Sequence, residues 1–273
     1  MSLHVLATGP LTLVEDLGRP GHAGIGVGRA GAADRGSLRR GNRLLGNPEN
    51  AAALEVLLGD LCVRAVRPLW VCVTGAPVPA FVDGRRVGHD ATLRLPAWAV
   101  LRLGVPVTGL RSYLCVRGGL DLPPVLGSRA HDTLSGLGPA PVEVGDRLPV
   151  GRPTGALPDV DHVVVRPNEG PLRPAEGPRS RWASPLAGTS WTVSSDSDRV
   201  AVRLAGAPLT RRTAELASEG LLPGAVQVPP DGRPVLFLAD APVTGGYPVV
   251  AVLSEREIDR VAQLRPGDPV RFA

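Results

Sequence analysis

Four short stretches of the sequence are dense in charged or hydroxyl side chains, and three of them also contain glycines, which allow a ligand to approach the backbone closely. In the first stretch, residues 15–21, Asp16 and Arg19 stand among glycines. In the second, residues 117–132, two arginines lie among small residues, and an arginine fork matches a carboxylate or a phosphate. This chemistry indicates a small anionic ligand. The alternative is structural, because an Asp and an Arg three residues apart in a loop often pair only with each other, and other arginines tie loops to the fold.

The other two stretches lie in the second half of the chain. Residues 194–199 carry serines and aspartates followed by an arginine, and residues 240–247 place a threonine and a tyrosine beside a glycine pair. The latter stretch leaves an apolar strand and is the better candidate for a pocket. Its alternative is a wide glycine turn with the tyrosine packed at the rim. Gln227 is able to hydrogen-bond an amide or a lactam, although a glutamine in a strand is more often simply solvated.

The basic residues restrict the chemistry further. All 30 Lys+Arg residues are arginine, so this chain has no Schiff-base lysine, no Walker-loop lysine and no lysine to carry biotin or lipoate. The formal net charge is only +4, the arginine doublets are scattered, and aromatic residues make up 3% of the chain. Nucleic-acid binding needs a basic stripe with aromatic side chains for stacking, so we expect no nucleic-acid partner.

Cysteine and histidine give no sign of a metal centre. The cysteines, Cys62, Cys72 and Cys115, never approach a C-x-x-C spacing, and the 5 histidines are isolated from one another. The sequence therefore predicts buried strand thiols and neither a metal site nor a disulfide framework. No stretch approaches the roughly 18 apolar residues of a membrane span, and the first ten residues lack the features of a secretory signal. We expect a cytoplasmic protein with no membrane partner.

The elements that must position these stretches are mostly short strands. Glycine (34 residues) and proline (29 residues) interrupt the apolar runs throughout the chain. The runs at 54–66 and 79–87 each read as two strands around a turn, at Gly59-Asp60 and Asp83-Gly84 respectively, because such dipeptides tolerate positive φ. Frequent breakers with apolar runs between them are typical of β-barrels and sandwiches.

Two helices are expected against this background. Asp34 is placed to cap a helix near 34–45, and Ser254 with Glu257 forms a capping box ahead of a helix near 254–264. A segment rich in proline and glycine, residues 151–161, separates the two halves of the chain. The predicted fold is mainly β, with two β-barrel-like lobes at residues 1–155 and 156–273 and a few short helices.

The same stretches resemble those of a known family, KipA or allophanate hydrolase subunit 2, also described as the C subunit of 5-oxoprolinase and as biotin-dependent carboxyltransferases. The similarity extends in order over nearly the whole chain and is therefore far more specific than any single motif. The matching strings are EDLGRPG (15–21), GAADRGSLRRGNRLLGN (31–47), AALEV (52–56), VTGA (73–76), VRGGLDLPPVLGSRAHDTLSGLG (116–138), GPRSRW (177–182), SDRVAVRLAG (197–206), SEGLLPGAVQVPPDG (218–232) and TGGYPV (244–249).

The resemblance implies two cyclophilin-like β-barrel lobes and an obligate partner similar to KipI, which forms the B subunit. In one setting of the family, this pair joins a third, LamB/YcsF-like protein, the A subunit, to open 5-oxoproline to glutamate with hydrolysis of ATP by the complex. The alternative is a carboxyltransferase that moves a carboxyl group from carboxybiotin to urea or a similar amide, with biotin carried on another chain. A second alternative is non-enzymatic, a binding protein that controls a sporulation kinase.

Opening a lactam is difficult because its carbonyl is a poor electrophile, and phosphorylating the amide oxygen makes it susceptible to water. In that reaction we expect Arg117, Arg129 and Arg199 to bind anionic groups. We expect Asp16, Gln227, Thr244 and Tyr247 to orient the substrate, and no residue qualifies as the general base. The expected substrate-binding residues are Asp16, Arg19, Arg117, Arg129, Arg199, Gln227, Thr244, Gly245, Gly246 and Tyr247.

Overall fold

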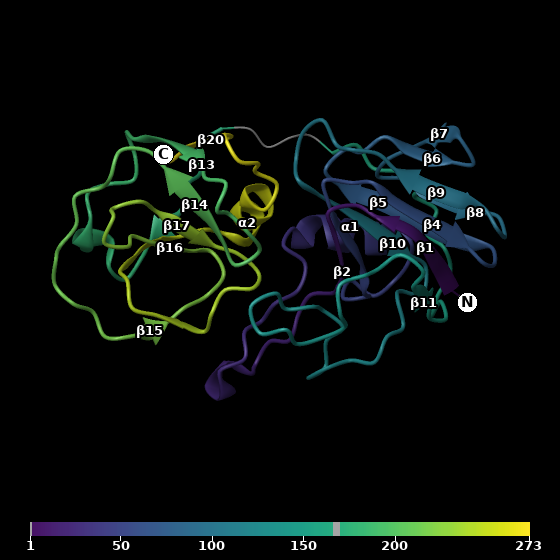
Figure 1. Cartoon of the computed structure of the whole chain (residues 1–273), viewed down its shortest axis with the longest axis horizontal. Coiled ribbons are helices and arrows are strands. Elements are labelled where there is room, and N and C mark those ends of the chain that lie inside the picture. Colours follow the sequence, from purple (N-terminus) through teal and green to yellow (C-terminus); the bar gives the residue numbers. More distant parts are fainter. Residues whose placement is uncertain (1, 166–169) are drawn as a thin grey trace. The chain divides into compact units, whose positions relative to one another are not determined.

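The structure, a computed structural model, describes residues 2–165 and 170–273. Its short extended segments pair into antiparallel sheets (Figure 1), so the mainly β fold class expected from the sequence is confirmed. The chain divides into two compact units. Unit 1 comprises Met1–Arg19, Asp34–Asp132 and Gly136–Arg166, and unit 2 comprises Pro20–Ala33, Thr133–Ser135 and Pro167–Ala273.

Unit 1 contains two antiparallel sheets that both contribute apolar side chains to one buried core. The first sheet runs, from edge to edge, β11 (Arg147–Pro149), β1 (Ser2–Thr8), β4 (Leu61–Ala65), β9 (Val100–Leu103), β6 (Ala80–Val82) and β7 (Arg85–Val87). The second runs β2 (Leu11–Glu15), β3 (Ala53–Leu57), β10 (Arg111–Val116), β5 (Leu69–Gly75) and β8 (Thr92–Leu95).

The two turns predicted in this unit have different structural roles. Asp83 and Gly84, with φ of 49° and 80°, join β6 to β7 as a true hairpin, as predicted. The strands expected around Gly59 also form, but they are not partners: β3 pairs with β2 and β10, while β4 pairs with β1 and β9. Gly59 therefore lies where the chain passes from one sheet to the other. A Cβ there would lie 1.9 Å from the carbonyl oxygen of Gly104, so only glycine fits.

Helix α1 (Arg35–Leu44) begins where the sequence predicted. The Asp34 side chain accepts a hydrogen bond from the backbone N–H of Ser37 at 2.9 Å and thereby caps the helix. The helix packs against β5 and β10. The approach is close, as a Cβ on Gly41 would lie 2.6 Å from Sγ of Cys115. A glycine on the buried face of α1 thus allows the helix to approach the sheet.

Unit 2 is built on one larger sheet and a two-stranded ribbon. Its core includes the fully buried Trp191 and apolar side chains from the sheet and from helix α2 (Glu255–Val261). The expected capping box of Ser254 and Glu257 is present. The sheet runs β12 (Ala175–Glu176), β19 (Val249–Val252), β16 (Ala225–Gln227), β17 (Val235–Phe237), β14 (Ala201–Ala205), β13 (Ser190–Val193) and β20 (Pro269–Arg271), and the ribbon pairs β15 (Glu219–Gly220) with β18 (Thr244–Gly245). Two 3-10 turns lie at Ala23–Ile25 and Ser180–Trp182.

The composition of the units differs from the expected lobes at 1–155 and 156–273 in two respects. Residues 156–165 belong to unit 1 and not to the second lobe. Two segments from the first half of the chain, Pro20–Ala33 and Thr133–Ser135, make their contacts within unit 2. No local pattern connects side chains that lie far apart in the sequence. Composition alone therefore did not indicate that these two segments belong to unit 2. The chain consequently passes between the units several times.

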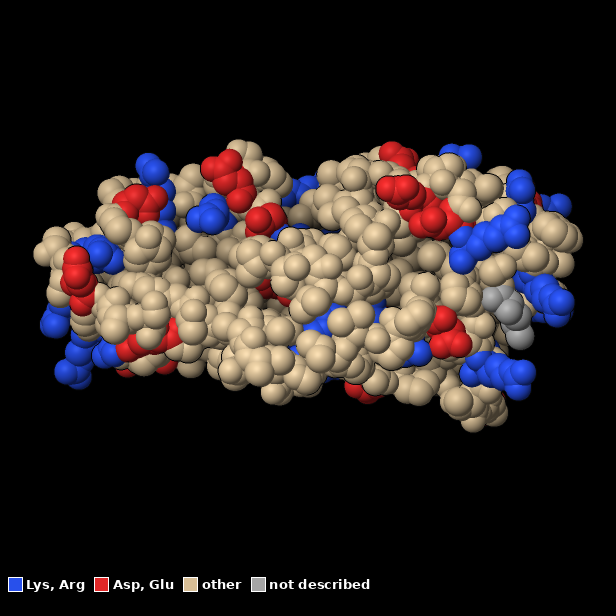
Figure 2. Space-filling view, turned by 60° about the horizontal axis from the view of Figure 1, so that its bottom comes forward, with Lys and Arg blue, Asp and Glu red and all other residues tan. Residues whose placement is uncertain are grey.

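The surface carries charges of both signs. On the face shown in Figure 2, arginines and acidic residues are interspersed and form no continuous basic stripe. Within the described ranges 2–165 and 170–273, no helix combines the length and the apolar character needed to cross a membrane.

A buried tyrosine connects the start of α1 to the second sheet of unit 1. The Tyr113 hydroxyl donates to Oε2 of Glu55 at 2.8 Å and accepts from the backbone N–H of Asp34 at 2.8 Å. Burial, together with the negative charges of Glu55 and Asp34, holds the pKa of Tyr113 well above its usual value. The phenol therefore stays protonated and serves as a fixed hydrogen-bond bridge.

We predict that Tyr113→Phe lowers the free energy of unfolding by about 1–3 kcal/mol, because it leaves a buried carboxylate and a buried backbone N–H each short of a partner. Urea denaturation monitored by circular dichroism measures this change. Tyr247→Phe is the matched control, since Tyr247 is 45% exposed, and its denaturation midpoint should stay at the wild-type value. Equal midpoints for all three proteins would contradict the bridging role.

Candidate functional site

The expected site residues divide between the two units. Asp16 follows β2 in unit 1 and is buried. Its Oδ1 accepts from the N–H of Gly18 at 2.7 Å and from Oγ of Ser128 at 2.6 Å, and its Oδ2 accepts from the N–H of Arg129 at 2.6 Å. The carboxylate thus closes its own loop and fixes the loop at 125–130, an arrangement that backbone N–H donors make strong.

Arg19 is also fully buried and bonds to the same loop. Its Nε donates to the carbonyl of Val125 at 3.4 Å, and its Nη2 donates to the carbonyl of Ala130. Within the described part of the chain, Nη1 has no hydrogen-bond partner. Asp16 and Arg19 therefore each bind the loop at 125–130, in addition to standing close in sequence.

Arg117 and Arg129 direct their donors to their own unit. Arg117 donates from Nη1 to the carbonyl of Leu45 at 2.7 Å and from Nη2 to the carbonyl of Gly155. Arg129 donates from Nε to the carbonyl of Leu122 at 2.6 Å and pairs with Asp121 at 3.0 Å. These contacts occupy N–H donors that an anionic ligand would require. They correspond to the structural alternative for this stretch, in which the arginines tie loops to the fold.

Arg199, in unit 2, forms a buried ion pair with Asp240. Nε lies 3.0 Å from Oδ2 of Asp240, and Nη2 donates to the carbonyl of Gly31 at 2.7 Å. Oδ2 of Asp240 also accepts from the backbone N–H and the hydroxyl of Thr133, at 3.0 and 2.6 Å. The side chains of the pair are 4% and 0% exposed. The pair holds Gly31 and Thr133, which come from the two inserted segments of unit 2.

The remaining expected residues of unit 2 lie together. Gln227, at the end of β16, is buried and donates from Nε2 to the carbonyl of Tyr247 at 2.9 Å. A Cβ on Gly245 would lie 2.6 Å from that same Nε2, so the absence of a side chain at Gly245 makes room for the amide. Thr244 precedes Gly245 in β18, and the Tyr247 side chain is exposed at the surface. The structure therefore brings these residues, with Gly246 between them, into one glycine–tyrosine site.

Sequence reasoning missed two charged residues of this site. Arg179 and Glu219 form a two-point ion pair in which Nε of Arg179 lies 3.3 Å from Oε2 and Nη2 contacts Oε1. This hydrogen bonding to Glu219 raises the pKa of Arg179. The Arg179 guanidinium also lies 5.8 Å from the centroid of the Trp182 ring. Glu219 is the register partner of Gly245 in the β15–β18 ribbon, which connects the ion pair to the glycine–tyrosine site.

A signal for this pair was present in the sequence. Both residues belong to strings that carry the family resemblance, 177–182 and 218–232. They are 40 residues apart, however, and no local spacing rule connects charges at that distance. The ribbon that contains Glu219 is two residues long on each side, too short to be recognised from alternation.

Two of the three cysteines, Cys72 and Cys115, lie together in unit 1 and are unsuited to act as nucleophiles. Cys72 and Cys115 face each other in the β5–β10 register. Burial, reinforced by the charge of Asp90, raises the pKa of Cys72 to about 12, and burial also raises the pKa of Cys115. Both thiols therefore stay neutral and are poor nucleophiles. Across residues 2–165 and 170–273, no group of three or more His, Cys, Asp or Glu side chains could hold a metal ion.

A mainly β chain with two units and a glycine–tyrosine site is consistent with the resemblance, and comparison confirms it. The chain belongs to the family described as carboxyltransferase domain, subdomain A and B, whose model matches residues 25–273. It is 38% identical to the C subunit of 5-oxoprolinase from Escherichia coli (strain K12), over 99% of this chain and 90% of that protein.

Solved structures show the same fold. The crystal structure of TTHA0988 superimposes with a TM-score of 0.91 at 32% identity, covering 100% of this chain and 55% of that chain. The urea amidolyase of K. lactis superimposes with a TM-score of 0.90 at 27% identity, covering 99% of this chain and 18% of that chain. This chain therefore spans about half of the first of these proteins and a smaller part of the second.

The buried ion pair leads to a stability prediction. Asp240→Asn leaves the Arg199 charge buried without its counter-ion, and we expect the free energy of unfolding to fall by about 3–5 kcal/mol. Asp231→Asn is the matched control: Asp231 faces Arg233 at 3.8 Å with both side chains 54% exposed, and its loss should cost less than about 1 kcal/mol. Thermal and urea unfolding of the two variants measure the difference. If both variants lost the same small amount, the pair would not be a major constraint on unit 2.

Proposed function

We propose that this chain is the C subunit of a 5-oxoprolinase, a complex that opens 5-oxoproline to glutamate with hydrolysis of ATP. The observation that carries the proposal is the 38% identity to the corresponding subunit of the Escherichia coli 5-oxoprolinase over 99% of this chain. The glycine–tyrosine site of unit 2 supplies chemistry suited to a small cyclic amide that also bears a carboxylate.

Gln227 is the group best suited to the lactam. Its Nε2 is engaged with the carbonyl of Tyr247, which fixes the amide orientation and leaves Oε1 as the acceptor for a lactam N–H. Gly245 has no side chain, which leaves space for this amide to lie against the ribbon. In this proposal Tyr247 and Thr244 provide hydroxyls at the rim.

Arg179 is the group best suited to the substrate carboxylate. Its Nε and Nη2 are held by Glu219, and Nη1 remains as a donor on the outer side of the fork. An arginine fixed by a carboxylate on one side keeps its orientation without having to be ordered by the ligand. The ion pair and the amide would then bind the two ends of one small molecule.

The three arginines expected from the sequence to bind anionic groups are poorly suited to ATP. Arg117, Arg129 and Arg199, the residues expected to bind anionic groups, all donate to carbonyls or carboxylates of their own unit. We therefore assign no ATP site to them and derive no step of the reaction through ATP. In the proposed complex, a KipI-like protein and a LamB/YcsF-like protein, the B and A subunits, complete the machinery.

A carboxyltransferase is the second candidate, and the family description and the likeness to a urea amidolyase favour it. Such an enzyme would move a carboxyl group from carboxybiotin to urea or a similar amide. Because this sequence contains no lysine, biotin would have to be attached to another chain. Gln227 would then orient an acyclic amide in place of a lactam.

Co-expression with the two partner proteins distinguishes the candidates. We predict that the purified complex hydrolyses ATP only when 5-oxoproline is present and forms glutamate in equal amount, as measured by coupled ADP release and by amino-acid analysis. Omission of this chain should abolish the activity. When a biotin carrier protein and a biotin carboxylase are added, avidin-sensitive consumption of urea, and none of 5-oxoproline, would instead establish the carboxyltransferase. Binding of a kinase regulator by a complex that turns over neither substrate would favour the regulatory alternative.

Two adjacent glycines provide a test of the site itself. Gly245→Ala places a Cβ 2.6 Å from Nε2 of Gln227 and should break the bond to Tyr247, whereas the nearest contact of a Cβ on Gly246 is 3.9 Å. Neither glycine has a left-handed φ, so alanine adds only the side-chain contact. We expect kcat/KM for 5-oxoproline to fall about tenfold or more in Gly245→Ala, equivalent to about 1.4 kcal/mol, and to stay within about twofold in Gly246→Ala. Unchanged kinetics in Gly245→Ala would exclude Gln227 from substrate binding.

A further inference from the structure

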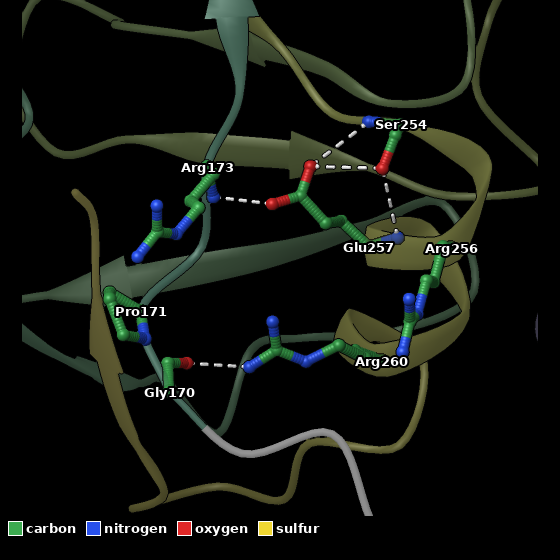
Figure 3. A pocket seen from close by; sticks show the side chains of 7 residues that line it. All are labelled: Gly170, Pro171, Arg173, Ser254, Arg256, Glu257 and Arg260. Atoms are coloured by element: carbon green, nitrogen blue, oxygen red, sulfur yellow. Dashed lines mark hydrogen bonds between the residues drawn. The ribbon is translucent and has the colours of Figure 1, made fainter.

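A pocket of unit 2 shares no residue with the glycine–tyrosine site. It has a volume of about 440 Å³, within the range of about 300–1,000 Å³ typical of small-molecule sites. It lies between the segment at 170–173 and the first turn of α2 (Figure 3). Three arginines dominate its lining, Arg173 from the segment and Arg256 and Arg260 from the helix.

The acidic residue of this pocket is already satisfied. Oε2 of Glu257 accepts from the N–H and the hydroxyl of Ser254, both at 3.1 Å, and Oε1 accepts from the backbone N–H of Arg173. Figure 3 shows this carboxylate turned toward Ser254 and the backbone of Arg173. The Glu257 carboxylate therefore accepts from three donors, two on Ser254 and one on the backbone of Arg173. Among the described residues, it forms no ion pair with the arginine side chains of the pocket.

The arginine side chains are less committed. Arg260 donates from Nη2 to the carbonyl of Gly170 at 2.6 Å, which extends it across the pocket (Figure 3). The guanidinium groups of Arg173 and Arg256 have no hydrogen bond or ion pair among the described residues. This differs from Arg117, Arg129 and Arg199, whose donors are in use. Two uncommitted guanidinium groups and one partly committed group thus line a single pocket.

We propose that this pocket binds the phosphoryl groups of a small phosphorylated molecule. Guanidinium forks recognise phosphate oxygens in pairs, and three of them around one satisfied carboxylate leave an excess of positive charge. Among the described residues of the lining, Pro171 is the one apolar side chain, so this part of the pocket offers little to a purely apolar ligand. Its volume exceeds the needs of a single inorganic phosphate and suits a polyphosphate chain or a phosphate ester.

The probes are tripolyphosphate, ATP and citrate, titrated into the full chain by isothermal titration calorimetry. An ionic strength of about 0.1 M screens attraction beyond about 10 Å, so that binding reports local contacts. We expect tripolyphosphate to bind more tightly than citrate. Tighter binding of ATP than of tripolyphosphate would identify a nucleotide as the source of the phosphoryl groups, and equal binding would show that the site reads phosphates alone. Citrate binding as tightly as tripolyphosphate would overturn the phosphoryl assignment.

Two variants test the residues. Arg173→Gln and Arg256→Gln should each weaken tripolyphosphate binding about tenfold or more, because each removes charge-assisted hydrogen bonds and leaves a neutral side chain of similar length. Both side chains are exposed, so the variants should unfold at the wild-type temperature. Arg233→Gln, at an exposed arginine of unit 2 outside the pocket, is the matched control and should bind within about twofold of wild type. No binding by wild type at millimolar tripolyphosphate, or equal weakening by the control, would overturn the proposal.

Discussion

The buried ion pair between Arg199 and Asp240 is the constraint on which unit 2 depends. A charge pair removed from water is tolerated only when its remaining donors and acceptors are also satisfied. Here the extra partners are the carbonyl of Gly31 and the N–H and hydroxyl of Thr133. These two residues belong to the segments that the first half of the chain contributes to the unit. The cost of burying the pair is therefore offset by contacts that also determine which segments the unit contains.

Arginine chemistry explains why a chain without lysine suits this architecture. A guanidinium has five N–H donors in a fixed plane and can bind several carbonyl oxygens at once, which an ammonium does less selectively. Arg19 and Arg117 each bind two loop carbonyls in this way. Residue type alone thus identifies an arginine as a donor, and only the neighbours decide whether its donors hold the protein together or remain for a ligand. Arg173 and Arg256 are in the second situation.

Patterns of residues close together in the sequence predicted the helices and turns well. Contacts between residues far apart in the sequence were largely not predicted. The cap at Asp34, the capping box at Ser254 and the turn at Asp83 depend on residues a few positions apart, and all three are confirmed. The strands before and after Gly59 were also predicted, but they do not pair with each other, because each belongs to a different sheet. The Arg179–Glu219 pair was missed because its two residues are 40 residues apart. Of the candidate site, the sequence indicated residues 244–247 and Gln227, which the structure places in contact across a separation of 20 residues.

The order in which a ribosome makes this chain gives the inserted segments a further consequence. Residues 20–33 and 133–135 emerge long before Arg199 and Asp240, the side chains that bind them. Nascent chains lengthen by about 5–20 residues per second, so Gly31 waits on the order of ten seconds or more for its partner. During that interval unit 1 can form its sheets, while residues 20–33 and 133–135 still lack the side chains that bind them. Completion of the second unit therefore has to await residues 199 and 240, and a fragment released before them would expose polar backbone that the folded unit conceals.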